Sequence, residues 1–132
     1  MKDLIEVMFI SPKKGKGVFA KTEIKKGTII DVAHVIPLPN KDYEKIRKTI
    51  LWNYCYIWED PKHEPEYQSA ISLSISQFIN HSYEPNVRYI YDYEYNCIEF
   101  ETLRDIEAGE EITVNYNGLI DDKSPVWFDI EE

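Results

Sequence analysis

Three short segments concentrate the residue types that bind small polar ligands or do chemistry. Gly15-Lys16-Gly17 pairs two glycines, which allow a ligand or another chain segment to approach the backbone closely. Residues 80–86 bring an amide, an imidazole and a hydroxyl together directly after an apolar stretch. Residues 109–116 follow a glycine turn and end in Tyr116. Each segment alone also fits an ordinary structural role, respectively a loop, a loop closed by its own Asn and Ser side chains, and an edge strand.

The sequence gives little support for a metal site, a reactive cysteine or a catalytic pair of carboxylates. The histidines are far apart in the chain and show no metal-ligand spacing, so we expect no metal site; they are His34, His63 and His81. Cys55 stands between two tyrosines in an apolar stretch, which favours an inert buried thiol. With only Cys97 besides, and no export signal, both thiols are expected to be reduced. Glu110 and Glu111 follow a turn and are interpreted as a solvated pair.

Length and composition limit the function classes. A chain of 132 residues is predicted to form one domain, residues 1–132, with enough core to fold without a disulfide or metal. The net charge of −9 argues against nucleic acid or anionic membrane as a partner and favours a basic protein. The N-terminal segment carries acidic residues and does not resemble a signal peptide, and no apolar run is long enough to span a membrane. We therefore expect a cytoplasmic or other intracellular protein, nuclear if its source is eukaryotic or viral.

The elements that must position these segments are mostly strands. Alternating or apolar patterns predict strands at 4–10, 18–20, 29–36 and 70–75, a strand-like segment at 52–58, a hairpin at 87–95 and 97–103, and a last strand at 111–116. Pro37 and Pro39 are expected to stop the third strand. Asn40 is a fair N-cap for one helix at 41–51. The predicted fold class is mainly β with one short helix.

A short internal repeat adds a prediction about the turns. Residues 24–30 and 106–112 share the pattern Ile-x-x-Gly-x-x-Ile. Glycine at the same offset favours the same tight turn into a strand, so we expect two similar corners in the β-structure.

In their order, the three segments resemble the SET-domain family of S-adenosylmethionine-dependent protein lysine methyltransferases. That family has an N-terminal GxG, an N-H-S-x-x-P-N block, and a G-E-E-L/I segment ending in Tyr; these read here as 15–17, 80–86 and 109–116. The resemblance covers about residues 4–118 and leaves a C-terminal aromatic tail at 119–132. It implies a SET-type β-clip fold of short strands with a C-terminal pseudoknot, in which 80–86 passes beneath the C-terminal strand.

The resemblance also implies roles. Tyr116 would be the active-site tyrosine, and Asn80 and His81 would hold the amino-acid and adenine parts of S-adenosylmethionine. The other implied cofactor contacts are Lys16, Gly17, Val18 and Trp127, and the candidates for the lysine channel are Tyr56, Trp58 and Phe128. The implied function is methyl transfer to a lysine of a basic protein, such as a histone-like or ribosomal protein.

Some positions depart from the family pattern. Asn115 stands where the family usually has Asp, and Gln77 where it often has Arg. The Cys-rich zinc segment that follows many SET domains is absent, and Trp127-Phe128 is a candidate to replace it. The alternatives are a non-catalytic SET-fold module that binds peptide or cofactor, and a plain β-rich scaffold. So small a domain could also form a homodimer to complete a peptide groove.

Overall fold

The fold was analysed in a computed structural model that describes residues 3–62, 66–116 and 123–126. This part of the chain is mostly β, as the sequence predicts. The strands are β1 (Ile5–Ser11), β2 (Gly15–Ala20), β3 (Ile29–Pro39), β4 (Cys55–Ile57), β5 (Tyr67–Ser72), β6 (Asn80–His81), β7 (Val87–Asp92), β8 (Cys97–Thr102) and β9 (Glu111–Val114). The helical elements are α1 (Asn40–Ile46) and the 3-10 turns η1 (Ile50–Tyr54) and η2 (Ile75–Phe78).

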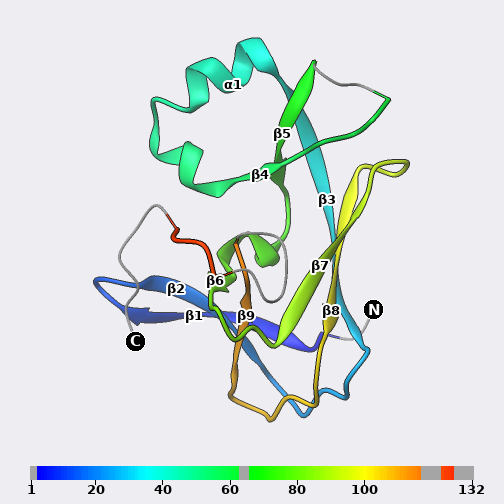
Figure 1. Ribbon diagram of the computed structural model, residues 1–132. Helices are drawn as coiled ribbons and strands as arrows, with labels where there is room; N and C mark the ends of the chain where they lie inside the picture. The colour runs from blue at the N-terminus through cyan, green and yellow to red at the C-terminus, as the bar shows by residue number, and fades with distance from the viewer. Residues whose placement is uncertain (1–2, 63–65, 117–122, 127–132) are drawn as a thin grey trace.

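The strands form two sheets (Figure 1). The first has the order β1-β2-β9-β6 and the second the order β4-β5-β3-β8-β7. All pairings are antiparallel except that of β6 with β9, which is parallel. The turn η2 leads into β6 and contacts β1 and β2 of one sheet and β3 of the other. The chain therefore brings residues 80–86 to the join between the sheets.

The two repeated corners pair with each other. Ile24 and Ile106 form an antiparallel bridge, with backbone N···O distances of 2.8 and 2.7 Å. Both side chains are buried in the core. Gly27 and Gly109 adopt φ values of 81° and 87°, where a side chain would be strained. The prediction of two similar corners is confirmed.

The prediction that Pro37 and Pro39 end the third strand is wrong, because β3 continues through both. Residues 29–34 of β3 pair with β8, whereas among the strands of the described ranges residues 35–39 pair only with β5. The second half of β3 thus has a free edge, and an edge strand tolerates residues that lack an N–H group. Pro37 lies opposite Ala70, and the register shifts between Leu38 and Pro39.

The predicted helix at 41–51 is wrong in extent. It ends at Ile46, and Thr49 is in an extended conformation before η1 begins. The Thr49 hydroxyl accepts a hydrogen bond from the Leu51 N–H, which favours a new turn over a continued helix. Ile50, within the predicted helix, is 72% exposed. The strand expected at 52–58 shrinks to β4, and the one at 70–75 lies at 67–72, because residues 75–78 turn as η2.

The glycine pair expected in a loop belongs to a strand. Gly15 opens β2 with a φ of 72°, and Lys16 pairs with Phe9 of β1. The β7–β8 hairpin is confirmed, with Asn96 at a φ of 50°, although its turn begins at Tyr93. Tyr95, expected on the strand face, is therefore an exposed turn residue.

The core joins both sheets. Its largest fully buried side chains include Trp58, Phe100 and the bridged pair Ile24 and Ile106. Cys97 is buried and Cys55 half-buried, both are free thiols, and burial raises the pKa of each. In the described ranges, none of the helices is long and apolar enough to cross a membrane.

Candidate functional site

A cavity of about 730 Å³ opens where β2, β4, η2 and β7 meet. This volume lies within the range of about 300–1,000 Å³ typical of small-molecule sites. Its charged lining residues are Lys14, Lys16 and Glu59. The polar and aromatic lining side chains are Asn53, Tyr54, Tyr56, Gln77, Phe78, Asn80, Tyr89, Tyr91 and Tyr116. An aromatic cavity with a few polar groups can hold an amphipathic ligand and exclude water from it.

The parallel pairing of β6 with β9 carries two of the predicted site residues. Asn80 is opposite Thr113 and His81 is opposite Val114. Directly after β9, the Tyr116 N–H donates to Nδ1 of His81 at 3.0 Å. His81 therefore positions the backbone of Tyr116. The start of the segment predicted to pass beneath the C-terminal strand thus lies beside β9, in parallel pairing with it.

Asn80 ties the first sequence segment to the third. Its Nδ2 donates to the Lys16 carbonyl at 3.1 Å and to Oε2 of Glu111 at 2.9 Å. Gly17 is required at this contact, because an added Cβ would lie 2.9 Å from that Glu111 oxygen and 3.0 Å from Asn80 Nδ2. The close approach that the glycine permits is thus to the protein's own residues.

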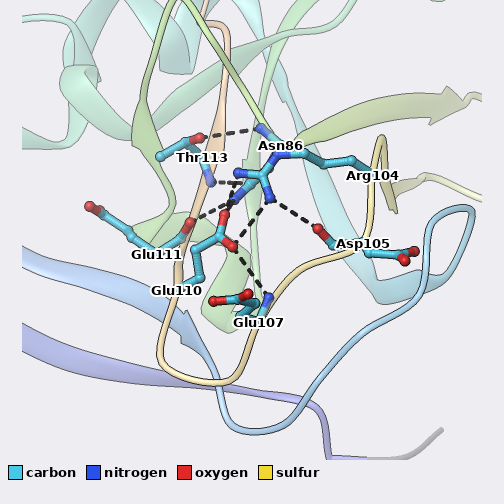
Figure 2. Close-up of polar contacts among 7 residues, drawn as sticks. All are labelled: Asn86, Arg104, Asp105, Glu107, Glu110, Glu111 and Thr113. Carbon is cyan, nitrogen blue, oxygen red and sulfur yellow. Dashed lines mark hydrogen bonds and ion pairs between the residues drawn. The ribbon is translucent and has the colours of Figure 1, made fainter.

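Asn86 fastens the end of the same segment to β9 (Figure 2). Its Oδ1 accepts from the Thr113 N–H at 2.8 Å, and its Nδ2 donates to the Glu111 carbonyl at 2.7 Å. The amide also donates to Glu110, whose carboxylate forms an ion pair with Arg104. The hydrogen bond from the Arg104 guanidinium lowers the pKa of Glu110.

The interpretation of Glu110 and Glu111 as a solvated pair is therefore wrong. The two side chains do diverge, but each meets a partner from the 80–86 segment or its surroundings. Glu110 bonds to Asn86 and Arg104, and Glu111 bonds to Asn80. A turn followed by a strand resembles a solvent-exposed edge in sequence, and only the parallel pairing with β6 reveals the partners.

Tyr116 is one of the residues that line the cavity. The hydroxyl donates to the Ile79 carbonyl at 2.6 Å. Burial raises the pKa of Tyr116 above its usual value of 10, with smaller contributions from Tyr54 and Tyr89. Burial likewise raises the pKa of Tyr56. These phenols stay neutral near pH 7, so they can orient a ligand through hydrogen bonds but do not supply a phenolate base.

The structure brings together four of the predicted site residues at the cavity: Lys16, Asn80, Tyr56 and Tyr116. His81, Gly17 and Val18 do not line it; Val18 is a core residue.

Trp58 does not line the cavity either. It is 1% exposed and packs edge-on against Tyr91 and Tyr93, which makes it a core residue rather than a channel wall. Trp127 and Phe128 lie outside the described residues, so their predicted roles stay predictions.

Phe78 also lines the cavity, although the sequence did not indicate it as a site residue. Phe78 stands two residues before the Asn-His block, and its nearness to that block was the available signal. Tyr89 and Tyr91 reach the cavity from β7, across the second sheet.

Both positions that depart from the family pattern have partners in the fold. Gln77 Oε1 accepts from the Ser72 N–H at 3.2 Å, and its Nε2 donates to the Tyr54 carbonyl at 2.6 Å. Asn115 is buried next to β9. A neutral amide at a buried position carries no desolvated charge there.

Comparison with known proteins identifies the family to which this chain belongs. A family model described as the SET domain matches residues 15–117. A Schizosaccharomyces pombe protein named histone-lysine N-methyltransferase, H3 lysine-37 specific, is 31% identical over 120 residues, which are 90% of this chain and 74% of that protein. The variant-silencing SET domain-containing protein of Plasmodium falciparum is 38% identical over 120 residues, covering 80% of this chain and 4% of that protein.

Two further matches agree. Histone-lysine N-methyltransferase SETD7 of Halocynthia roretzi is 26% identical, covering 93% of this chain and 36% of that protein. A crystal structure of a Plasmodium falciparum protein, named as a candidate histone methyltransferase, superposes with a TM-score of 0.66 at 25% identity, over 88% of this chain and 95% of that one. The predicted fold class is confirmed. Because the family model spans most of the chain and the S. pombe relative matches 90% of it, the chain belongs to the SET-domain family.

Proposed function

We propose that this protein transfers a methyl group from S-adenosylmethionine to the side-chain amine of a lysine in a basic protein. The observation that carries the proposal is the meeting of Lys16, Asn80 and Tyr116 at one aromatic cavity. The names of the S. pombe and Halocynthia relatives, both histone-lysine N-methyltransferases, support a lysine as the acceptor.

The residues at the cavity fit such a cofactor. The side-chain NH2 of Asn80 donates to the Lys16 carbonyl and to Glu111. Its Oδ1 can then act as an acceptor, which suits an ammonium group. Phe78 and the tyrosines offer apolar faces for an adenosyl group or a methylene chain. When bound, S-adenosylmethionine would supply a methyl group on a positively charged sulfur.

Tyr116 would orient the acceptor. Its hydroxyl gives its proton to the Ile79 carbonyl, so toward an amine it would act as a hydrogen-bond acceptor. The amine must be neutral to attack, and lysine's ordinary pKa is about 10.4. An aromatic cavity that holds the amine away from bulk water would disfavour the ammonium form and lower that pKa. Alignment of acceptor and donor could supply roughly 7–11 kcal/mol of the rate enhancement.

The substrate class follows from charge. The net charge of −9 attracts basic proteins and steers their encounter at low ionic strength. A histone-like or ribosomal protein has the required chemistry. The same negative net charge disfavours direct binding to nucleic acid or to an anionic membrane.

The proposal is tested by incubating the protein with methyl-labelled S-adenosylmethionine and a panel of basic proteins, read by mass spectrometry. Methylated lysines are expected. Calorimetry should show cofactor binding, and Asn80→Ala should weaken it, since an unpaired buried polar group costs roughly 1–3 kcal/mol. Asn96→Gly removes an amide at the β7–β8 turn, away from the cavity, and should leave binding unchanged. Cofactor binding without methylation of any protein would favour the non-catalytic module, and no binding at millimolar cofactor would contradict both.

A further inference from the structure

Asp31 is a half-buried carboxylate on the core side of β3, outside the site described so far. It stands at the register shift that follows Ile29 and lies opposite Phe100 of β8. Side chains two residues apart share one face of a strand, so Asp31 is on the face that Ala33 and Val35 bury in the core. A carboxylate on such a face needs a hydrogen-bond partner to offset its lost hydration.

The partner of Asp31 is Ser74, which lies 43 residues further along the chain. The Ser74 hydroxyl donates to Oδ2 of Asp31. Ser74 is the residue before η2, a position where a serine side chain commonly accepts from the N–H groups of the first turn. It makes no such capping bond here. The hydroxyl is instead committed to β3, and it fastens the beginning of η2 to that strand.

The residues of η2 hold two tyrosines of the cavity wall. The Tyr56 hydroxyl donates to the Ser76 carbonyl at 3.4 Å. Gln77 Nε2 donates to the Tyr54 carbonyl at 2.6 Å. Both tyrosines line the cavity. A shift of η2 would therefore move them or break these bonds.

The end of η2 leads directly to the acceptor of the Tyr116 hydroxyl. Ile79 closes the turn, and its N–H donates to the Ser76 carbonyl at 3.1 Å. The Ile79 carbonyl accepts from the Tyr116 hydroxyl at 2.6 Å. Ser76 is fully buried, so close packing leaves the turn little freedom to move independently of its neighbours. The turn thus connects Asp31 at its beginning with Tyr116 at its end.

Asp31 lies within electrostatic reach of the same wall. Burial is the main cause of the raised pKa of Tyr56, and Tyr116, Tyr89 and Asp31 add to it. Asp31 does not itself line the cavity. It therefore acts on a bound ligand through the residues that η2 holds.

We propose that Asp31 is a positioning residue for methyl transfer, because its bond to Ser74 fixes η2 and η2 places Tyr56 and Tyr116 relative to each other. This inference rests on the proposed function. The two tyrosines come from β4 and from the segment after β9, and η2 is the element that accepts hydrogen bonds from one and adjoins the acceptor of the other. A misplacement of about 1 Å far from the reacting atoms can cost roughly 100-fold in rate, so the position of such an element affects chemistry.

The test removes each side of the bond separately and together. Asp31→Ala removes the acceptor, Ser74→Ala removes the donor, and the double variant removes both. Asp31→Asn keeps an acceptor oxygen at the same place and removes the charge. The control is Asp105→Ala, because Asp105 also accepts a hydrogen bond, from the Lys26 N–H at 2.8 Å, but at an exposed corner outside the cavity.

Four quantities are measured for each protein: kcat, the KM of the acceptor, the Kd of S-adenosylmethionine by calorimetry, and the melting temperature. The acceptor is the protein of the basic panel that the wild type methylates fastest. We expect Asp31→Ala and Ser74→Ala each to lower kcat about fivefold to twentyfold, with KM and Kd within about twofold of wild type. The double variant should be no slower than the single ones, since both remove the same bond. Asp31→Asn should recover most of the rate, and the control should match wild type.

Three results would overturn the inference while leaving the proposed function intact. A lower melting temperature with unchanged kcat would make the bond merely structural. Losses that multiply in the double variant would show that the two residues act independently. An Asp31→Asn variant as slow as Asp31→Ala would show that the charge, rather than the position of η2, matters. If Asp31→Ala does not fold, Ser74→Ala and Asp31→Asn decide the question. Failure of the wild-type protein to methylate any protein of the panel would instead remove the proposed function, and the inference with it.

Discussion

The backbone N–H of Tyr116 donates a 3.0 Å hydrogen bond to Nδ1 of His81, across 35 residues of sequence. The rings of the two residues also lie in contact, with centroids 5.3 Å apart. His81 does not line the cavity, so it acts on the site through the residue that does. The bond requires Nδ1 to be an acceptor, which is the state of a neutral imidazole.

Removing the Tyr116 hydroxyl separates chemistry from binding. Tyr116→Phe keeps the ring and loses the bond to the Ile79 carbonyl. If the hydroxyl orients the amine only in the transition state, kcat should fall at least about tenfold, equivalent to roughly 1.4 kcal/mol, with little change in cofactor Kd. Steady-state kinetics and calorimetry on one preparation provide the measurement. A parallel loss of kcat and cofactor affinity would show that Tyr116 is a packing residue.

Acid should weaken the protein through His81. Burial lowers its pKa below the ordinary value of 6.5, so the unfolded chain binds a proton at a higher pH than the folded one. The contribution of neutral His81 to stability is therefore complete above pH 6.5 and is lost as pH falls through the folded-state pKa. Unfolding free energies from urea titrations at several pH values should decrease over this window.

Two variants test whether His81 causes this decrease of the unfolding free energy with falling pH. His81→Gln should flatten the decrease, whereas His34→Gln, on the exposed side of β3, should retain it. An unchanged slope in His81→Gln would mean that other groups set the acid sensitivity.

Gly17→Ala should damage the cofactor site. The new methyl would lie 2.7 Å from Ile10 Cδ1 and 2.9 Å from Glu111 Oε2, so these side chains have to move, and Glu111 is the acceptor that holds Asn80. Overpacking of this kind costs typically 1–3 kcal/mol of stability, and we expect cofactor affinity to fall as well. Gly27→Ala is the control: its φ of 81° makes it costly in backbone strain, but its surroundings are open and lie at a remote corner. It should lower the melting temperature without changing cofactor Kd, and equal effects on Kd would contradict the assignment.

The buried hydrogen bonds of Asn86 should contribute more to stability than the half-exposed ion pair between Arg104 and Glu110. Asn86 is 2% exposed and satisfies the Thr113 N–H and the Glu111 carbonyl. Asn86→Ala leaves both groups without these partners, and we expect a loss of roughly 2–6 kcal/mol, at about 1–3 kcal/mol for each group. Arg104→Met breaks a half-exposed ion pair and should cost at most about 1 kcal/mol. Urea unfolding measures the free energy of unfolding of both variants. Similar losses would show that the ion pair contributes as much to this contact as Asn86 does.

The aromatic tail is predicted to contact the cofactor or the lysine channel. The double substitution Trp127→Ala and Phe128→Ala should weaken cofactor binding, since an aromatic contact is worth about 0.5–1.5 kcal/mol beyond its buried area. Two substitutions are preferable to a truncation of the tail, because a truncation could remove Ser124, whose backbone carbonyl accepts a hydrogen bond from the Tyr83 hydroxyl. If the tail instead covers the core or a second copy of the chain, the melting temperature or the oligomeric state measured by light scattering should change while cofactor Kd does not.

Much of this fold is local in origin, and the sequence alone determined that part. The alternating patterns predicted β1 and the β7–β8 hairpin, and the repeated Ile-x-x-Gly-x-x-Ile predicted two corners with glycine at positive φ. These features depend on neighbouring residues, which a pattern records. The ordered motifs also indicated the SET-domain family and placed Asn80 and Tyr116 in the site.

Only the tertiary structure decided what depends on partners far away in the chain. Pro37 is tolerated because β3 has a free edge there, and edges are set by strand order. Glu110 and Glu111 gain partners because β6 lies beside β9. Trp58 packs in the core, and Lys16 faces a cavity, because of how the two sheets meet. A side chain's role is fixed by what surrounds it, and those surroundings come from segments that no local pattern links.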